Sequence, residues 1–145
     1  MSASIDSSHY ILVVDDEPLH RRLISLMLGR AGYIIDTAKD GREALAKIRM
    51  HRPTAIILDL EMPELSGLEL LAKMAQDPAL KTIPTIVVSA NADKPEARAL
   101  LSRYYTFVDV IQKPFLKLHL LERVQHTQRP SNAIHNGVSH SHFAD

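Results

Sequence analysis

Three acidic side chains directly follow short apolar segments of the sequence. Asp15 and Asp16 come after the β-branched segment 10–14, and Asp59 comes after the apolar segment 55–58. Carboxylates that are brought together repel one another unless a cation neutralises them. An oxygen-only site with few carboxylates and room for several waters suits Mg²⁺, with Mn²⁺ as a substitute. These residue types therefore predict a divalent metal site wherever the fold brings the three carboxylates together.

A hydroxyl and an amine stand at the ends of two further apolar segments. Ser89 ends the segment 83–89, and Lys113 follows the segment 107–112. A metal ion, a carboxylate nucleophile, a hydroxyl donor and a lysine are together the groups that hold a phosphoryl group during its transfer. If all of these side chains share one site, the chemistry we expect there is phosphoryl transfer.

The apolar segments alternate with amphipathic ones, and this alternation predicts five units of a strand followed by a helix. Strands are expected at 10–14, 33–38, 55–58, 83–89 and 107–112. Helices are expected before Gly32, where Leu19, Leu23, Leu26 and Met27 have helical spacing, and at 41–51, 67–76, 95–103 and 116–126. Short connections of this kind imply right-handed crossovers and a parallel sheet with helices on both faces, which is a doubly wound α/β domain. Ligands bind such sheets at the carboxyl ends of the strands, so the candidate residues are expected to converge there.

Each candidate residue also has an ordinary structural explanation. Asp16 can cap the first helix, and Asp59 and Ser89 can be turn residues. Lys113, ahead of Pro114, can be a solvated surface lysine. Each of these roles is common by itself, but together they would have to place every candidate at the same edge of the sheet by coincidence.

The composition limits the classes of function that remain. The chain has 145 residues, 46 % of them apolar, and its 17 Lys plus Arg balance 17 Asp plus Glu. A neutral chain gives no support to nucleic-acid binding, and the lack of cysteine excludes disulfides and thiolate metal sites. No apolar run approaches the ~20 residues of a membrane span and no signal segment is recognisable, so we expect a cytoplasmic protein. Residues 1–8 are expected to be an extension, 9–126 the folded domain, and 127–145 a disordered polar tail that contains histidines.

Five motifs at these positions resemble those of the receiver domain of two-component response regulators. They are Val13-Val14-Asp15-Asp16-Glu17-Pro18, Asp40-Gly41-Arg42-Glu43-Ala44-Leu45, Asp59-Leu60-Glu61-Met62-Pro63-Glu64-Leu65-Ser66-Gly67, Val88-Ser89-Ala90 and Lys113-Pro114-Phe115. The match covers about residues 9–126, in the order and spacing of the family. The resemblance implies a flavodoxin-like sheet with the strand order 2-1-3-4-5. It also implies a stand-alone receiver that acts in a two-component or phosphorelay pathway.

The resemblance implies a role for each residue of the phosphoryl site. Asp59 matches the aspartate that is phosphorylated by a sensor histidine kinase or a histidine phosphotransfer protein. Ser89 matches the hydroxyl that turns to bind the phosphoryl group, and Lys113 matches the lysine that pairs with its oxygens. Such a protein is a switch rather than a turnover enzyme. It catalyses only its own phosphorylation and autodephosphorylation, and its changed conformation alters its contact with a downstream protein.

The metal ligands follow from the same resemblance. Asp16, Asp59 and the backbone carbonyl of Glu61 match the direct ligands of Mg²⁺, while Asp15 matches the carboxylate that holds metal-bound water. A direct contact with nucleic acid or with a membrane is not implied.

The chain departs from the family at two places, and two other functions stay open. Where the family usually has Gly-Ala in the turn before the fifth strand, this chain has Thr106-Phe107. The family usually has Tyr or Phe three residues before the lysine, where this chain has Val110. A receiver-like interaction module that works without phosphorylation is therefore one alternative. The other is an aspartyl-phosphate hydrolase, because Asp59-Leu60-Glu61 resembles the Asp-x-Asp motif of haloacid-dehalogenase-like phosphatases. That family carries its motif on the first strand, whereas here it follows the third predicted strand.

Overall fold

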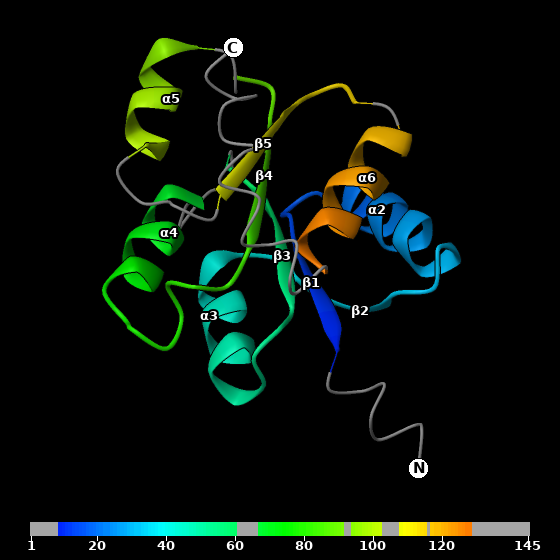
Figure 1. Ribbon diagram of the computed structural model, residues 1–145, viewed down its shortest axis with the longest axis horizontal. Helices are drawn as coiled ribbons and strands as arrows, with labels where there is room; N and C mark the ends of the chain where they lie inside the picture. The colour runs from blue at the N-terminus through cyan, green and yellow to red at the C-terminus, as the bar shows by residue number, and fades with distance from the viewer. Residues whose placement is uncertain (1–8, 61–66, 92–93, 103–107, 116, 129–145) are drawn as a thin grey trace.

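The computed structural model describes residues 9–60, 67–91, 94–102, 108–115 and 117–128. Within these ranges five strands alternate with five helices (Figure 1). The strands are β1 (Tyr10–Val14), β2 (Ile34–Ala38), β3 (Ala55–Asp59), β4 (Thr85–Ser89) and β5 (Val108–Gln112). The helices are α2 (Pro18–Arg30), α3 (Gly41–Met50), α4 (Gly67–Ala75), α5 (Pro95–Leu101) and α6 (Lys117–Thr127). The alternation predicted from the sequence is confirmed, with element ends shifted by a few residues.

All five strands pair in parallel in the order β2-β1-β3-β4-β5. Helices α2 and α6 cover one face of this sheet, and α3, α4 and α5 cover the other (Figure 1). The expectation of a doubly wound, flavodoxin-like sheet with the order 2-1-3-4-5 is therefore confirmed. Every residue of β1, β3 and β4 is buried, as continuous apolar strands between two helix layers should be.

Alternate residues of the strands supply two separate cores. Leu12 and Ile56 pack with Ile48 of α3 on one face, while Ile11 and Ile57 pack on the other. This alternation follows from the period of two in a strand, which sends successive side chains to opposite faces of the sheet. Because both faces are packed, the central strands hold their carboxyl ends at fixed relative positions.

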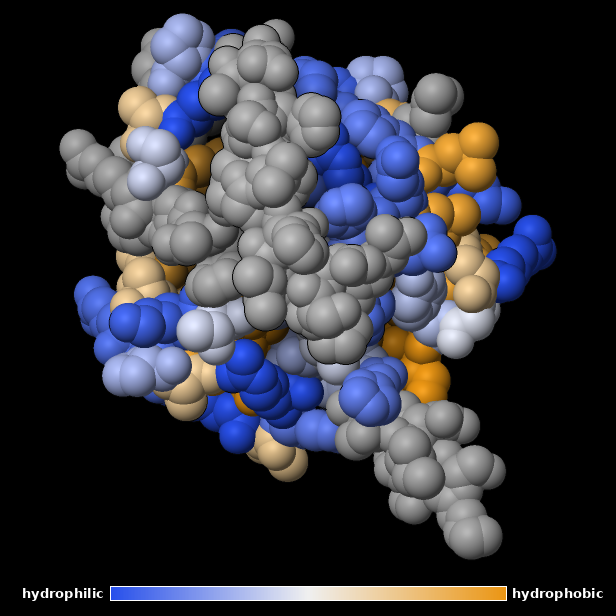
Figure 2. Space-filling view, in the orientation of Figure 1, coloured by the Kyte–Doolittle hydropathy of each residue, from blue (hydrophilic) through white to orange (hydrophobic). Residues whose placement is uncertain are grey.

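The first helix presents its leucines differently from the usual amphipathic pattern. Leu19, Leu23 and Leu26 gave the helical spacing, yet they are 65 %, 51 % and 50 % exposed. The buried positions of α2 are Ile24 and Leu28, which lie four residues apart and pack into the core on that side. Figure 2 accordingly shows apolar residues on the surface on the side of α2 and α6. The spacing predicted the helix correctly but does not identify the face that is buried.

Several sequence expectations fall on segments outside the described ranges. They are the extension 1–8, the position of Glu61 and residues 129–145 of the tail that was expected at 127–145. The start of that tail is corrected, because α6 includes Thr127. None of the helices in the described ranges combines the length and the hydropathy needed to cross a bilayer.

Candidate functional site

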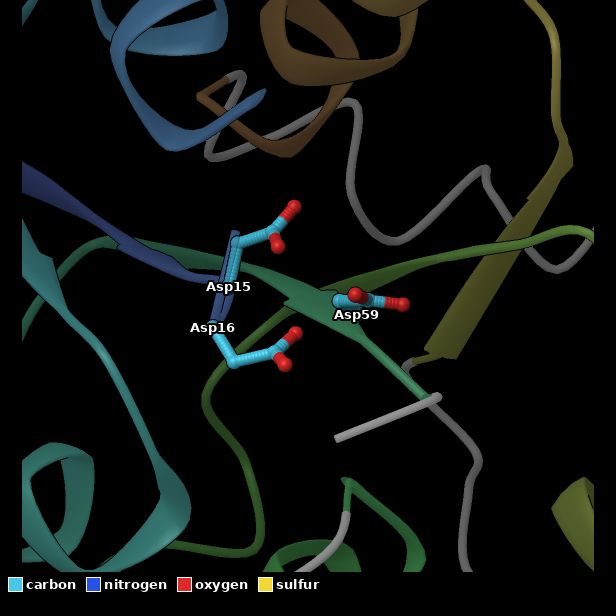
Figure 3. A group of neighbouring side chains, drawn as sticks. All are labelled: Asp15, Asp16 and Asp59. Carbon is cyan, nitrogen blue, oxygen red and sulfur yellow. The ribbon is translucent and has the colours of Figure 1, made fainter. Parts of the chain in front are cut away.

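The three predicted acidic residues lie together at the carboxyl edge of the sheet. Asp15 and Asp16 follow β1, Asp59 ends β3, and these strands are hydrogen-bonded neighbours. One ligand oxygen from each lies within 4.8 Å of the others, and Figure 3 shows the three side chains gathered in one region. Asp15 and Asp59 are only 1 % and 5 % exposed, while Asp16 is half-buried. The predicted convergence of the acidic side chains is observed.

The turn after β1 places these two aspartates in different roles. Glu17 is the N-cap of α2 and has no side-chain cap, and Pro18 occupies the first turn of the helix. The backbone N–H of Glu17 donates to Oδ1 of Asp15 at 2.9 Å. The capping role considered for Asp16 is therefore not the one that the structure shows, and the carboxylate of Asp16 is directed into the acidic cluster (Figure 3).

Lys113 brings a positive charge to the cluster. Its Nζ lies 3.4 Å from Oδ1 of Asp59, and its side chain is 24 % exposed against 5 % for the aspartate. Its backbone N–H donates to the carbonyl of Ser89 at 2.9 Å, which ties the end of β5 to the end of β4. The amine of Lys113 thus offsets the charge of a carboxylate that is almost completely buried.

Ser89 is fully buried at the end of β4, next to the strand that carries Asp59. Its Oγ accepts a hydrogen bond from the backbone N–H of Asn91 at 3.0 Å. The hydroxyl thus lies at the same sheet edge as the acidic cluster, as predicted. Glu61 lies outside the described residues, so the structure says nothing of its carbonyl.

Two features of the site were missed by the sequence reasoning. Gly67, the first residue of α4, approaches the acceptor strand so closely that an added Cβ would lie 2.7 Å from the carbonyl oxygen of Asp59. His20 of α2 contacts Oδ2 of Asp15 through its Nδ1. Both residues had a signal in the sequence, because Gly67 ends the receiver-like motif that begins at Asp59, and His20 follows Asp15 by five residues at the start of a predicted helix.

The donor set fits Mg²⁺. Asp15, Asp16 and Asp59 offer only oxygen atoms, and hard cations of this kind prefer carboxylate oxygens. Cysteine and a histidine cage, which would favour softer metals, are not part of this group of three. The arrangement is able to concentrate positive charge next to the carboxylate of Asp59.

Comparison with known proteins identifies the family. A model of the response regulator receiver domain matches residues 11–125. The chain is 46 % identical over 107 residues to protein-glutamate methylesterase/protein-glutamine glutaminase 1 of Anaeromyxobacter dehalogenans. That match covers 73 % of this chain but only 30 % of the relative, so the chain spans less than a third of the relative's length.

Solved structures agree with this result. The chemotaxis protein CheY4 of Vibrio cholerae has a TM-score of 0.75 and 32 % identity, with 82 % of this chain and 98 % of that chain covered. The response regulator TrrA of Thermotoga maritima, solved in complex with Mg(2+)-BeF, has a TM-score of 0.69 and 33 % identity over the same shares of the two chains. From the matched sequence, the sheet order and the acidic edge together, the chain belongs to the response regulator receiver domains of two-component systems.

Proposed function

We propose that this chain is a phosphorylation switch in which Asp59 accepts a phosphoryl group from a sensor histidine kinase or a histidine phosphotransfer protein. The observation that carries the proposal is the surroundings of Asp59. Its buried carboxylate lies within 4.8 Å of two others and has the amine of Lys113 3.4 Å away. A structural aspartate at the end of a strand has no need of two further carboxylates and a lysine.

The proposed reaction assigns a task to each side chain. A carboxylate oxygen of Asp59 attacks phosphorus, and the P–N bond to the donor histidine breaks. The electron pair of that bond goes to the ring nitrogen, which takes up a proton. Lys113 neutralises charge on the phosphoryl oxygens, and the hydroxyl of Ser89 donates a hydrogen bond to one of them. Because the transition state is loose, positioning and charge neutralisation supply most of the catalysis.

The metal ion is proposed to be Mg²⁺, with Mn²⁺ able to replace it. Asp16 and Asp59, with the backbone carbonyl of Glu61, would hold it directly, and Asp15 would hold it through water. Bound there, a divalent ion supplies positive charge that offsets both the clustered carboxylates and the phosphoryl oxygens.

The test is phosphorylation by a small-molecule donor. The intact chain is incubated with acetyl phosphate and Mg²⁺, and its mass is measured beside that of Asp59→Asn. We expect one added phosphoryl group on the native chain, none on Asp59→Asn, and none on either in EDTA. Trapping the acyl phosphate with borohydride then identifies the modified residue. A label on Asp15 or Asp16 would overturn the assignment of the acceptor.

The same experiment separates the alternative functions. A chain that takes up no phosphoryl group although it binds Mg²⁺ would be the phosphorylation-independent interaction module. A chain that hydrolyses acetyl phosphate through many rapid turnovers would be the aspartyl-phosphate hydrolase. The named activity of the methylesterase relative is not proposed for this chain, which spans only 30 % of that protein.

A further inference from the structure

Asp15 has both of its carboxylate oxygens engaged by the chain itself. Oδ1 accepts the backbone N–H of Glu17 at 2.9 Å, and Oδ2 is in contact with Nδ1 of His20. The Asp15 side chain is only 2 % exposed, so bulk solvent contributes few hydrogen bonds to its carboxylate. An ionised carboxylate can only accept hydrogen bonds, and Nδ1 of His20 is therefore the donor in this contact.

The imidazole of His20 is itself held in place. It lies in the first turn of α2, with 27 % of its side chain exposed. The ring also meets Phe115 edge-on, with ring centroids 6.3 Å apart and planes at 61°. Phe115 belongs to the segment that carries Lys113, so the His20 ring contacts both Asp15 and that segment. A donor fixed in this way can fix its acceptor in turn.

We infer that His20 is a positioning residue for Asp15. By donating to Oδ2 it keeps the buried carboxylate directed toward Asp16 and Asp59, and it thereby strengthens the binding of a divalent cation by the cluster. This inference rests on the proposed function, because it assumes that the cluster binds Mg²⁺. It adds a residue that none of the receiver motifs in this chain contains and that acts through Asp15 rather than on the phosphoryl group.

The expected effect is moderate, because one of the two donors to Asp15 remains when His20 is lost. Removal of the hydrogen-bond partner of a direct metal ligand typically weakens metal binding by about 10- to 100-fold. Asp15 would hold the ion only through water, which places the effect of His20 at the lower end of that range. The backbone N–H of Glu17 continues to hold Oδ1 in any His20 variant. We therefore expect Mg²⁺ affinity to fall by about 10-fold, at the lower end of that range.

Two substitutions separate the hydrogen bond from the bulk of the ring. His20→Leu removes the donor but keeps an apolar side chain against Phe115. His20→Asn places an amide nitrogen at the same number of bonds from the backbone as Nδ1, so it can still donate to Asp15. The matched control is His9→Leu, at an exposed position before β1 and hence at the opposite edge of the sheet.

The measurements are Mg²⁺ titration by calorimetry, Mn²⁺ titration by electron paramagnetic resonance and the phosphorylation rate with acetyl phosphate. Urea unfolding in the absence of metal shows whether each variant is folded. If His20→Leu does not fold, His20→Ala replaces it. We expect His20→Leu to bind both ions about 10-fold more weakly, and His20→Asn and His9→Leu to bind them within about 2-fold of the native chain.

The outcomes distinguish this inference from the proposed function. A native chain that neither binds Mg²⁺ nor becomes phosphorylated refutes the proposed function itself. A native chain that does both, with unchanged metal affinity in His20→Leu, overturns the role of His20 alone. Equal weakening in His20→Leu and His20→Asn would also overturn it, because the loss would then come from the missing ring and not from the hydrogen bond.

Discussion

Gly67→Ala tests whether the close approach of α4 to the acceptor strand is required. A Cβ at this position would lie 2.7 Å from the carbonyl oxygen of Asp59 and 2.8 Å from Cα of Leu60. Both contacts are with backbone, which cannot move aside as a flexible side chain can. Forcing one extra carbon into a packed site costs about 1–3 kcal/mol. Gly67 is the first residue of α4, where the helix-propensity gain of an interior alanine does not apply, so we expect a net loss of about 1–3 kcal/mol.

The assay is urea unfolding combined with the rate of phosphorylation by acetyl phosphate. The rate should fall as well, because relief of the clash moves the backbone of Asp59. Gly29→Ala is the matched control, since Gly29 lies in α2 and, apart from its own helix backbone, no atom lies within 4 Å of an added Cβ. That control should gain up to about 1 kcal/mol. A Gly67→Ala protein as stable as the native chain and phosphorylated at the same rate would refute the reasoning.

Three further predictions concern other parts of the fold and site. Burial, aided by the charge of a nearby aspartate, raises the pKa of Tyr10 to about 12 from its usual 10. As the pH rises from 10 to 12, the unfolded chain loses the phenolic proton before the folded chain does, so the free energy of unfolding falls. In urea unfolding, Tyr10→Phe should not show this fall in stability at alkaline pH. At pH 7 its free energy of unfolding should be about 1 kcal/mol lower than that of the native chain, because the hydrogen bond from the Tyr10 hydroxyl to a backbone carbonyl is gone. Lys113→Ala should slow phosphorylation by acetyl phosphate about 100-fold, because the amine that neutralises the phosphoryl oxygens is lost. Calorimetry should show an equal or higher Mg²⁺ affinity, because a positive charge beside Asp59 is removed. With beryllofluoride bound as a mimic of the phosphoryl group, amide hydrogen exchange should change over residues 90–105. Unchanged exchange there would exclude a response carried by the backbone of this segment, which we expect because Val110 replaces the usual aromatic residue.

The parts of the fold that the sequence predicted well are those set by local periodicity. A continuous apolar strand such as 10–14 is predicted to be a central strand that is buried on both faces of a doubly wound sheet. The acidic residue that follows it must then lie at the carboxyl edge of the sheet. The candidates Asp15, Asp16, Asp59, Ser89 and Lys113 are therefore found at that edge. Their roles follow from the family resemblance and stay predictions.

What the sequence did not predict depends on how elements pack against one another. The exposure of Leu19, Leu23 and Leu26 is set by the rotation of α2 about its own axis, and helical spacing alone does not fix that rotation. The close approach of Gly67 to Asp59 requires knowledge of where α4 starts relative to β3. Such distances of a few ångströms arise from tertiary packing, for which no residue pattern within one element is a guide.

The packing around Ser89 explains why the response to phosphorylation is expected in the backbone. Oγ of Ser89 accepts from the N–H of Asn91 at 3.0 Å, and the side-chain amide of Gln112 donates to the carbonyl of Ala90 at 2.7 Å. The family resemblance implies that the Ser89 side chain rotates toward a phosphoryl group, and we expect such a rotation to take Oγ away from the N–H of Asn91. Val110 is half-buried and β-branched, with one dominant rotamer, so it cannot move between buried and exposed positions as an aromatic ring can. We therefore predict that in this chain the response to phosphorylation appears in the backbone after Ser89 rather than as a side-chain rotation in β5.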